Sequence, residues 1–221
     1  SIMPFPVELV ACGLVNAPIC LLPLQWGNLS RIWGKIVASA ERRGIMTPFA
    51  IAGIQMFLGH GSNLDHMRQR IDLTMHLYPW VQMVMFSELA VFGPMLHHAQ
   101  PLPGGTEEEF QAIAKHHKIW LINGSMYERR DGGIYNTTSV INPEGEVIGR
   151  YRKMFPFTPL EQGVQPGTEF FVWDIDGVGR FGLLNCYDIW FPETSRTLTA
   201  MGAEVILHPV MTHTIDRDID L

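Results

Sequence analysis

The sequence has few cysteines and little clustered positive charge. Its 221 residues include three cysteines, Cys12, Cys20 and Cys186, whose spacing fits neither a zinc site nor a disulfide-rich scaffold. We therefore expect a reducing compartment, and the cytoplasm is the predicted location. The net charge is −6 and no basic run is longer than two residues, so nucleic acid is an unfavourable partner.

The sequence also lacks a pattern of metal ligands. Histidine pairs occur at 97–98 and 116–117, on a predicted loop and a predicted helix, without the spacing of a ligand set. The acidic stretch at 216–220 lacks the glycine and the terminal glutamate of a calcium-binding loop. We therefore predict no metal and no cofactor.

One long uncharged stretch stands near the N-terminus, at residues 9–30. Its length would permit a membrane span, but Pro18 and Pro23 interrupt it and no basic segment precedes it. We expect this stretch to pack on protein, with a membrane or targeting role as the alternative. Together with a predicted helix at 30–43, it forms a predicted N-terminal helical extension over residues 1–45, followed by a main domain over residues 46–221.

The main domain alternates between apolar strands and amphipathic helices. Helices are predicted to begin near Ser62, at Thr106 with a capping box to Glu109, and near Pro192. Strands are predicted at residues 49–57, 81–88, 119–128, 134–143, 146–155, 170–175, 179–185 and 204–210. This order predicts an α/β fold with a mixed sheet and outer helices, without internal repeats.

Three ionisable residues stand near the ends of predicted apolar strands. Glu88 ends "VMFSE", Lys153 lies in "RYRKMF" and Cys186 ends "GLLNC". Strand ends are where an α/β sheet exposes reactive groups to a crevice. Taken singly, each residue also suits a structural role, as a salt-bridge partner, a solvated lysine or a small buried thiol.

The strings around these residues resemble the nitrilase superfamily of carbon–nitrogen hydrolases over about residues 49–215. They read "FSELAVFG", "YRKMFPF" and "NCYDIWFPE", and the resemblance implies that Glu88, Lys153 and Cys186 are catalytic. A second glutamate of the family's amidases matches Glu161 in "TPLEQGVQPG". The implied fold is an αββα sandwich of the nitrilase type, with mixed sheets and outer helices, incomplete at its C-terminus.

These residue types suit hydrolysis through a thioester. Glu88 would take the thiol proton while Cys186 attacks an amide carbon, and the Lys153 ammonium and the Tyr187 N–H would receive the oxyanion. A helix starting near Pro192 would favour the thiolate. We expect Glu161 to orient the substrate or Lys153. Four aromatic residues are candidates to line a substrate pocket, with ordinary packing in the core as the alternative, namely Phe155, Phe157, Trp190 and Phe191.

The pair Tyr187-Asp188 resembles amidases and carbamoyl-amide hydrolases and favours a small linear amide or N-carbamoyl amine over a nitrile. Nitrile hydrolysis is the alternative within the class. A non-catalytic binding or assembly module is the alternative from another class, because residues 1–45 are additional and little chain follows the last predicted strand. A membrane-attached enzyme is a third interpretation. The resemblance also implies a homo-oligomer paired through outer helices.

Overall fold

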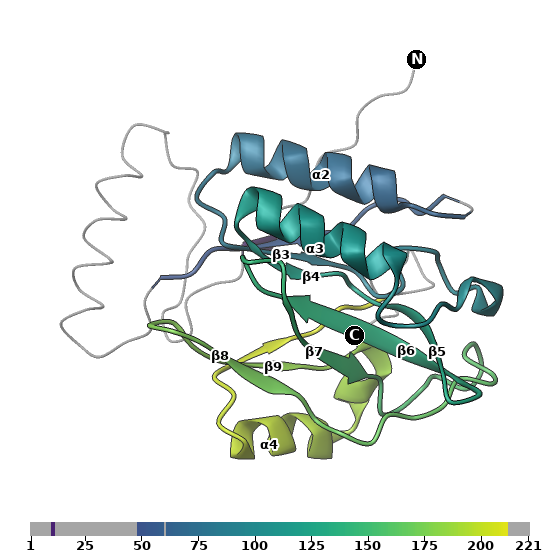
Figure 1. Cartoon of the computed structure of the whole chain (residues 1–221). Coiled ribbons are helices and arrows are strands. Elements are labelled where there is room, and N and C mark those ends of the chain that lie inside the picture. Colours follow the sequence, from purple (N-terminus) through teal and green to yellow (C-terminus); the bar gives the residue numbers. More distant parts are fainter. Residues whose placement is uncertain (1–9, 12–47, 60, 212–221) are drawn as a thin grey trace, which may run out of the picture.

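The computed structural model describes residues 10–11, 48–59 and 61–211 (Figure 1). The predicted helix at 30–43 and most of the uncharged stretch at 9–30 lie outside these residues. The helices of the described part are α2 (Leu64–Leu77), α3 (Gly105–His117), α4 (Pro192–Ala200) and two 3-10 turns (Leu96–His98 and Cys186–Trp190). The strands are β1 (Val10–Ala11), β2 (Ile51–Ile54), β3 (Met83–Phe86), β4 (Trp120–Ile122), β5 (Met126–Arg130), β6 (Gly133–Ile141), β7 (Val147–Arg152), β8 (Val172–Ile175), β9 (Gly179–Leu183) and β10 (Val205–Leu207).

The strands form two mixed sheets. The larger sheet has the order β1-β2-β3-β4-β6-β5, with β7 on the other edge of β6. Strands β2, β3 and β4 are parallel to one another, whereas β6 pairs antiparallel with β4, β5 and β7. In the smaller sheet, β9 lies between antiparallel β8 and parallel β10. The predicted α/β class with mixed sheets and outer helices is confirmed.

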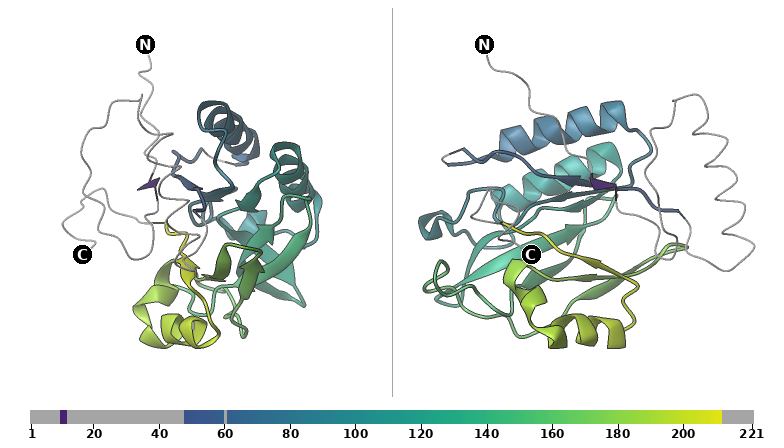
Figure 2. Two further views of the ribbon diagram at one scale, coloured as in Figure 1. Left: turned by 90° about the vertical axis from the view of Figure 1, so that its left-hand side faces the viewer. Right: turned by 180° about the vertical axis from the view of Figure 1, so that it is seen from behind.

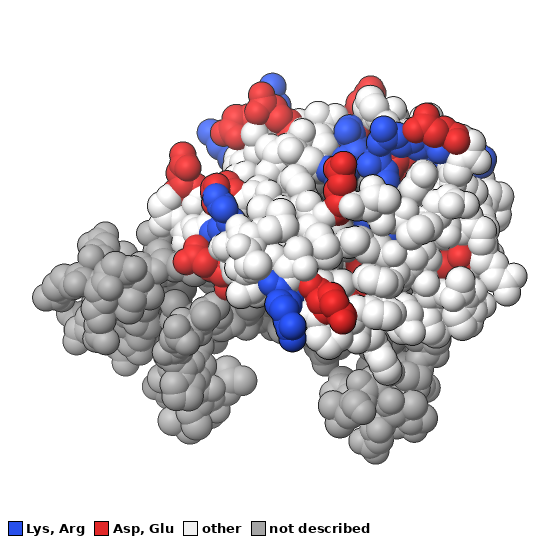
Figure 3. All heavy atoms as spheres, turned by 90° about the horizontal axis from the view of Figure 1, so that it is seen from below, with Lys and Arg blue, Asp and Glu red and all other residues white. Residues whose placement is uncertain are grey.

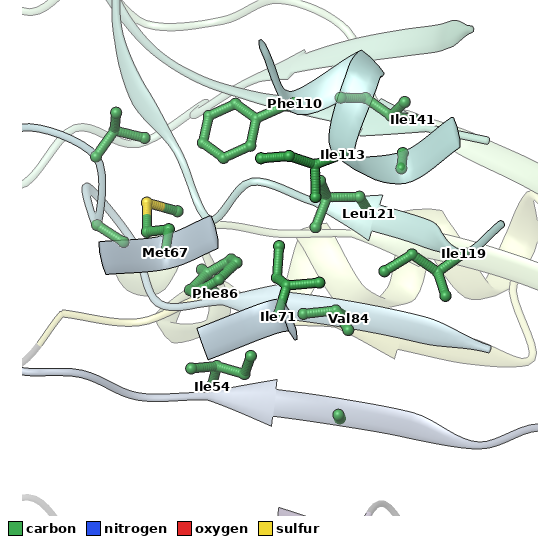
Figure 4. Close-up of a cluster of buried hydrophobic side chains, with 14 of the residues drawn as sticks. Ile54, Met67, Ile71, Val84, Phe86, Phe110, Ile113, Ile119, Leu121 and Ile141 are labelled. Atoms are coloured by element: carbon green, nitrogen blue, oxygen red, sulfur yellow. The ribbon is translucent and has the colours of Figure 1, made fainter. Parts of the chain in front are cut away.

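The elements stack in layers, with α2 and α3 over the large sheet and α4 beyond the small sheet (Figures 1 and 2). One core packs the two helices on the large sheet, with Met67 and Phe110 meeting Phe86 and Leu121 (Figure 4). A second core lies between the sheets, and strand β3 contributes to both cores because its two faces are buried.

Two local predictions were wrong in detail. Helix α3 begins at Gly105, so Thr106 lies inside it, and its hydroxyl donates to Gln100 Oε1 at 2.8 Å instead of capping the helix. The single strand predicted at 119–128 is two strands, β4 and β5, separated by a bend at residues 123–125. At the bend Gly124 has φ +84°, and a Cβ there would lie 2.0 Å from the Ser87 carbonyl oxygen. Only glycine permits so close an approach.

On the face that carries α4, acidic and basic side chains are interspersed (Figure 3). Asp174 and Arg180 form an exposed ion pair, in which Arg180 Nε lies 2.8 Å from Asp174 Oδ1. Within the described residues, no helix combines the length and the hydropathy needed to cross a membrane.

Candidate active site

Glu88 stands two residues beyond the end of β3 and is 2% exposed. Its neighbours on both sides are fixed by the bend between β4 and β5. Ser87 packs against Gly124, and the Leu89 N–H donates to Ser125 Oγ at 2.9 Å while Leu89 adopts φ 53°. A left-handed leucine is uncommon, and such conformations gather at functional sites where the surrounding structure holds them.

Lys153 follows directly after β7, and its ammonium lies between two carboxylates. Its Nζ donates to Glu88 Oε1 at 2.8 Å and to Glu161 Oε2 at 2.6 Å, and the lysine is 1% exposed. Burial opposes the charge of Lys153, but Glu88 and Glu161 outweigh it, so its pKa is raised. The structure therefore brings three of the predicted residues into direct contact, with the ammonium kept charged.

A fourth residue, Asn136 on β6, completes this cluster and was missed in the sequence. Its Nδ2 donates to Glu88 Oε1 at 2.9 Å and to Glu161 Oε1 at 2.7 Å. The signal for it was the run "NTTS" at 136–139, four polar residues inside a strand, all of which are buried. Buried polar groups need partners, so such a run indicates a polar network on the sheet.

Cys186 lies three residues beyond β9, at the start of the 3-10 turn, with φ 44°. Its backbone N–H donates to the Pro209 carbonyl at 2.9 Å, and its Sγ lies 3.8 Å from the Met211 carbonyl oxygen. The Met211 N–H in turn donates to Glu88 Oε2 at 3.2 Å. The segment after β10 therefore joins the sulfur to the carboxylate, and sequence analysis had assigned it no role.

The thiol is not poised as a thiolate. Burial and the charge of Glu88 raise the pKa of Cys186 from its ordinary 9.0 to about 12, and Lys153 offsets this only in part. The hydrogen bond of the thiol runs to the Met211 carbonyl, and the Met211 N–H in turn binds Glu88. The 3-10 turn separates Cys186 from the start of α4, so the predicted effect of that helix on the thiolate stays a prediction. The sulfur therefore needs a base at the moment of attack.

Asp188 holds the turn of Cys186 against the end of β7. Its carboxylate accepts hydrogen bonds from Tyr151 Oη at 2.7 Å, Phe155 N at 2.8 Å and Asn185 N at 2.9 Å. The side chain is fully buried, and burial raises its pKa. Because Tyr151 and Phe155 flank Lys153 and Asn185 precedes Cys186, Asp188 fixes the lysine and the thiol relative to each other.

The aromatic residues predicted to bind substrate form one cluster beside Cys186. Tyr187 meets Phe157 at 5.0 Å and Phe191 at 5.3 Å between ring centroids, and Phe155 stacks on Phe191 at 3.9 Å. Trp190 lies at the edge of this cluster and is 77% exposed. The proposed contacts of Tyr187, Trp190 and Phe155 with a substrate stay predictions.

Tyr127 is a further residue that the sequence did not single out. It lies directly opposite Asn136 in the β5–β6 ladder and is 3% exposed. Burial and the charges of Glu161 and Glu88 raise its pKa, so the phenol stays neutral. Within the described part of the chain its hydroxyl has no hydrogen-bond partner.

Across residues 48–59 and 61–211, no group of three or more His, Cys, Asp and Glu side chains is arranged to hold a metal ion. The carboxylates of the cluster are instead occupied by Lys153 and Asn136.

Comparison with known proteins identifies the family. The model of the carbon-nitrogen hydrolase family matches residues 16–217, which is most of the chain. The chain belongs to the carbon-nitrogen hydrolase family. The match takes in residues 16–45 of the predicted N-terminal extension, and the domain boundary at residue 46 stays a prediction.

Curated relatives of this hydrolase-family chain include several amidases. A formamidase from Bacillus cereus is 29% identical over 157 residues, which cover 66% of this chain and 47% of the relative. The omega-amidase NIT2 of Homo sapiens is 31% identical over 51% of this chain and 44% of its own. The 2-oxoglutaramate amidase of Bacillus subtilis is 37% identical over 42% of this chain and 36% of its own. The chain therefore spans about half the length of these relatives, or less.

Solved structures support the same fold. Nit3 of Saccharomyces cerevisiae, a member of the nitrilase superfamily, aligns with a TM-score of 0.64 at 25% identity, over 72% of this chain and 63% of that one. An amidase from Nesterenkonia sp. aligns with a TM-score of 0.62 at 22% identity, over 75% of this chain and 66% of that one. At 22% identity, the alignment with the Nesterenkonia amidase supports the fold alone.

Proposed function

We propose that this chain hydrolyses the carbon–nitrogen bond of a small linear amide or N-carbamoyl amine through a thioester on Cys186. One observation carries the proposal. A buried lysine is held charged between Glu88 and Glu161, and the Met211 backbone links the Cys186 sulfur to Glu88 Oε2. A structural salt bridge would need no nucleophile beside it, whereas acyl transfer to a thiol uses a base for its proton and a donor or cation for the oxyanion.

In the first step, the Cys186 sulfur attacks the carbonyl carbon while its proton passes to the Glu88 carboxylate. The raised pKa of the thiol makes this transfer necessary, since an unassisted thiol at neutral pH supplies little thiolate. Asn136 and Lys153 already occupy Glu88 Oε1, whereas Oε2 meets only the weaker donor at Met211 N. We therefore assign proton transfer to Oε2.

The tetrahedral intermediate carries an oxyanion, which the Lys153 ammonium and the Tyr187 backbone N–H receive. Loss of one such donor typically costs on the order of 10²–10³ in rate. Glu161 is a positioning residue in this scheme, because it binds Lys153 Nζ and is itself fixed by the Phe157 N–H at 2.7 Å. This arrangement holds the ammonium in place without a rearrangement during the reaction.

Collapse of the intermediate breaks the carbon–nitrogen bond, and Glu88 returns its proton to the departing ammonia or amine. A water molecule then attacks the thioester carbon and gives a proton to Glu88. The carbon–sulfur bond breaks, the acid is released and the thiol is restored.

The substrate class rests on two supports, the Tyr187-Asp188 pair and the names of the relatives, which include a formamidase and two other amidases. The test is release of ammonia from matched pairs, such as propionamide against propionitrile, by the wild type and Cys186→Ala. We expect amide turnover to exceed nitrile turnover and to vanish in Cys186→Ala, while Cys12→Ala and Cys20→Ala stay active. Faster turnover of nitriles would support the nitrilase alternative.

The binding or assembly module is distinguished by the same experiment together with chemical labelling. An inactive chain whose Cys186 resists iodoacetamide even at pH 10, where the thiolate fraction is about 100 times that at pH 8, would favour such a module. Mapping the labelled peptides separates Cys186 from Cys12 and Cys20.

We further propose that the chain forms a homo-oligomer through its outer helices, in the cytoplasm. Support comes from α2, where Leu73 and Leu77 are exposed on successive turns, 41% and 50%, with Trp80 beyond them at 57%. Light scattering after size-exclusion chromatography tests this assembly, and a monomer at micromolar concentration would contradict it.

A further inference from the structure

Strand β10 runs parallel to β9, and the same hydrogen-bond pattern continues past both strands to the nucleophile. The Leu184 N–H donates to the Leu207 carbonyl at 3.0 Å, and the Cys186 N–H donates to the Pro209 carbonyl at 2.9 Å. In a regular parallel ladder, the N–H of Met211 would come next and would donate to the Cys186 carbonyl.

The hydrogen bonds of Met211 and of the Cys186 carbonyl depart from this ladder pattern. The Met211 N–H donates to Glu88 Oε2 at 3.2 Å instead. The Cys186 carbonyl oxygen is met by a side chain, His208 Nε2, at 2.8 Å. Because a carbonyl oxygen only accepts, Nε2 of His208 must carry the hydrogen.

This hydrogen bond acts on the peptide group that joins Cys186 to Tyr187. That group is planar and trans, so its carbonyl and the Tyr187 N–H point in opposite directions. An imidazole that fixes the carbonyl therefore also fixes the direction of the N–H. The chain leaves the strand direction here, at the left-handed Cys186, so no regular ladder holds the peptide plane.

We propose that His208 is a positioning residue, which holds the Tyr187 N–H in its orientation as an oxyanion donor by binding the opposite end of the same peptide group. The proposal rests on the proposed function, in which that N–H receives the oxyanion. Donation to the carbonyl also polarises the peptide group, which makes its N–H a stronger donor. His208 touches neither the substrate nor the sulfur in this role.

The test compares two reactions of Cys186 that differ in their need for an oxyanion donor. In acylation by p-nitrophenyl acetate, a carbon–sulfur bond forms through a tetrahedral oxyanion and p-nitrophenolate leaves. In alkylation by iodoacetamide, the sulfur displaces iodide and no oxyanion forms. Both rates are measured at Cys186 by peptide mapping in the full chain, for the wild type, His208→Phe, His208→Gln and a control, His76→Phe, on the exposed end of α2.

We expect His208→Phe to slow acylation about 10- to 100-fold, below the full loss of an oxyanion donor, because the N–H is misdirected and not removed. Its alkylation rate should stay within about two-fold of the wild type, since alkylation forms no oxyanion. His208→Gln places an amide N–H near the position of Nε2 and should restore most of the acylation rate. His76→Phe should match the wild type in both reactions.

Equal slowing of acylation and alkylation in His208→Phe would overturn the proposal, because it would show a general displacement of the thiol. An unchanged acylation rate in His208→Phe would also overturn the proposal. So would an acylation rate in His208→Gln as slow as that in His208→Phe. If the wild type is acylated by the ester but releases no ammonia from amides, the proposed function fails while this test still decides the role of His208. A wild type that is alkylated but never acylated at Cys186 contradicts both.

Discussion

Lys153 Nζ lies 2.8 Å from Glu88 Oε1, although 65 residues separate the two in the chain. With Glu161 on the other side, one ammonium is buried between two carboxylates. Such an arrangement is stable only while it is complete, because removing one partner leaves buried charge uncompensated.

The first prediction concerns this lysine. Lys153→Met should lower the free energy of unfolding by about 3–5 kcal/mol at pH 8, since two carboxylates stay buried without their cation. Urea unfolding at pH 8 checks this, with Lys115→Met, an exposed site on α3, as the control that should change stability little. A loss in Lys153→Met no larger than that in Lys115→Met would contradict the account.

The second prediction concerns the pH dependence of thiol reactivity. Because the pKa of Cys186 is raised to about 12, its alkylation by iodoacetamide should keep rising between pH 7 and 10 without a plateau. Glu88→Gln removes a charge that raises this pKa, so the alkylation profile should shift to lower pH. Amide turnover in the same variant should fall by about 10²–10⁴, the usual contribution of a general base. A profile that moves to higher pH would show that Glu88 does not stabilise the protonated thiol.

The third prediction compares two buried tyrosines. The Tyr151 hydroxyl donates to the Asp188 carboxylate, so Tyr151→Phe should cost about 1.5–3 kcal/mol of unfolding free energy. The Tyr127 hydroxyl lacks a partner among the described residues, so Tyr127→Phe should leave stability unchanged or raise it by up to about 1 kcal/mol. Denaturant unfolding measures both. A loss above about 1 kcal/mol in Tyr127→Phe would reveal a hydrogen bond that this structure does not show.

The fourth prediction concerns the bend that supports Glu88. Gly124→Ala combines a left-handed φ with a Cβ 2.0 Å from the Ser87 oxygen, and should cost about 3 kcal/mol or more. Gly132→Ala is the matched control, because φ is +78° there but no atom lies within 4 Å, and it should cost only about 1 kcal/mol. Similar losses in the two variants would show that the contact with Ser87 is unimportant.

The sequence identified the ionisable residues of the candidate site better than it identified the residues that hold them in place. Glu88, Lys153 and Cys186 were singled out because each lies near the end of a predicted apolar strand, within a string that resembles the nitrilase superfamily. Glu161 was singled out by that resemblance alone. The α/β order was likewise predictable from alternating apolar strands and amphipathic helices.

The other residues of the site are placed by the pairing of strands that are distant in the sequence, so they could not be predicted from the sequence alone. Asn136 reaches Glu88 and Glu161 only because of its position in β6, and His208 reaches the Cys186 carbonyl only because β10 lies beside β9. The need of the thiol for a base was predicted, but the upward shift of its pKa was missed, because burial depends on the whole fold. A helix start read from the sequence gives a direction of influence but no distance, and here a 3-10 turn intervenes.

The central claim is tested most directly by mass spectrometry of the enzyme during turnover. Wild-type protein mixed with a short-chain amide and quenched in acid should yield a Cys186 peptide heavier by the acyl group, as a thioester that hydroxylamine removes. Glu88→Gln should accumulate less of this thioester. Both its formation and its hydrolysis need the carboxylate, but formation is the earlier step, so its loss decides the amount. Ammonia release that continues with no acyl group on Cys186, or that persists in Cys186→Ser, would contradict the account.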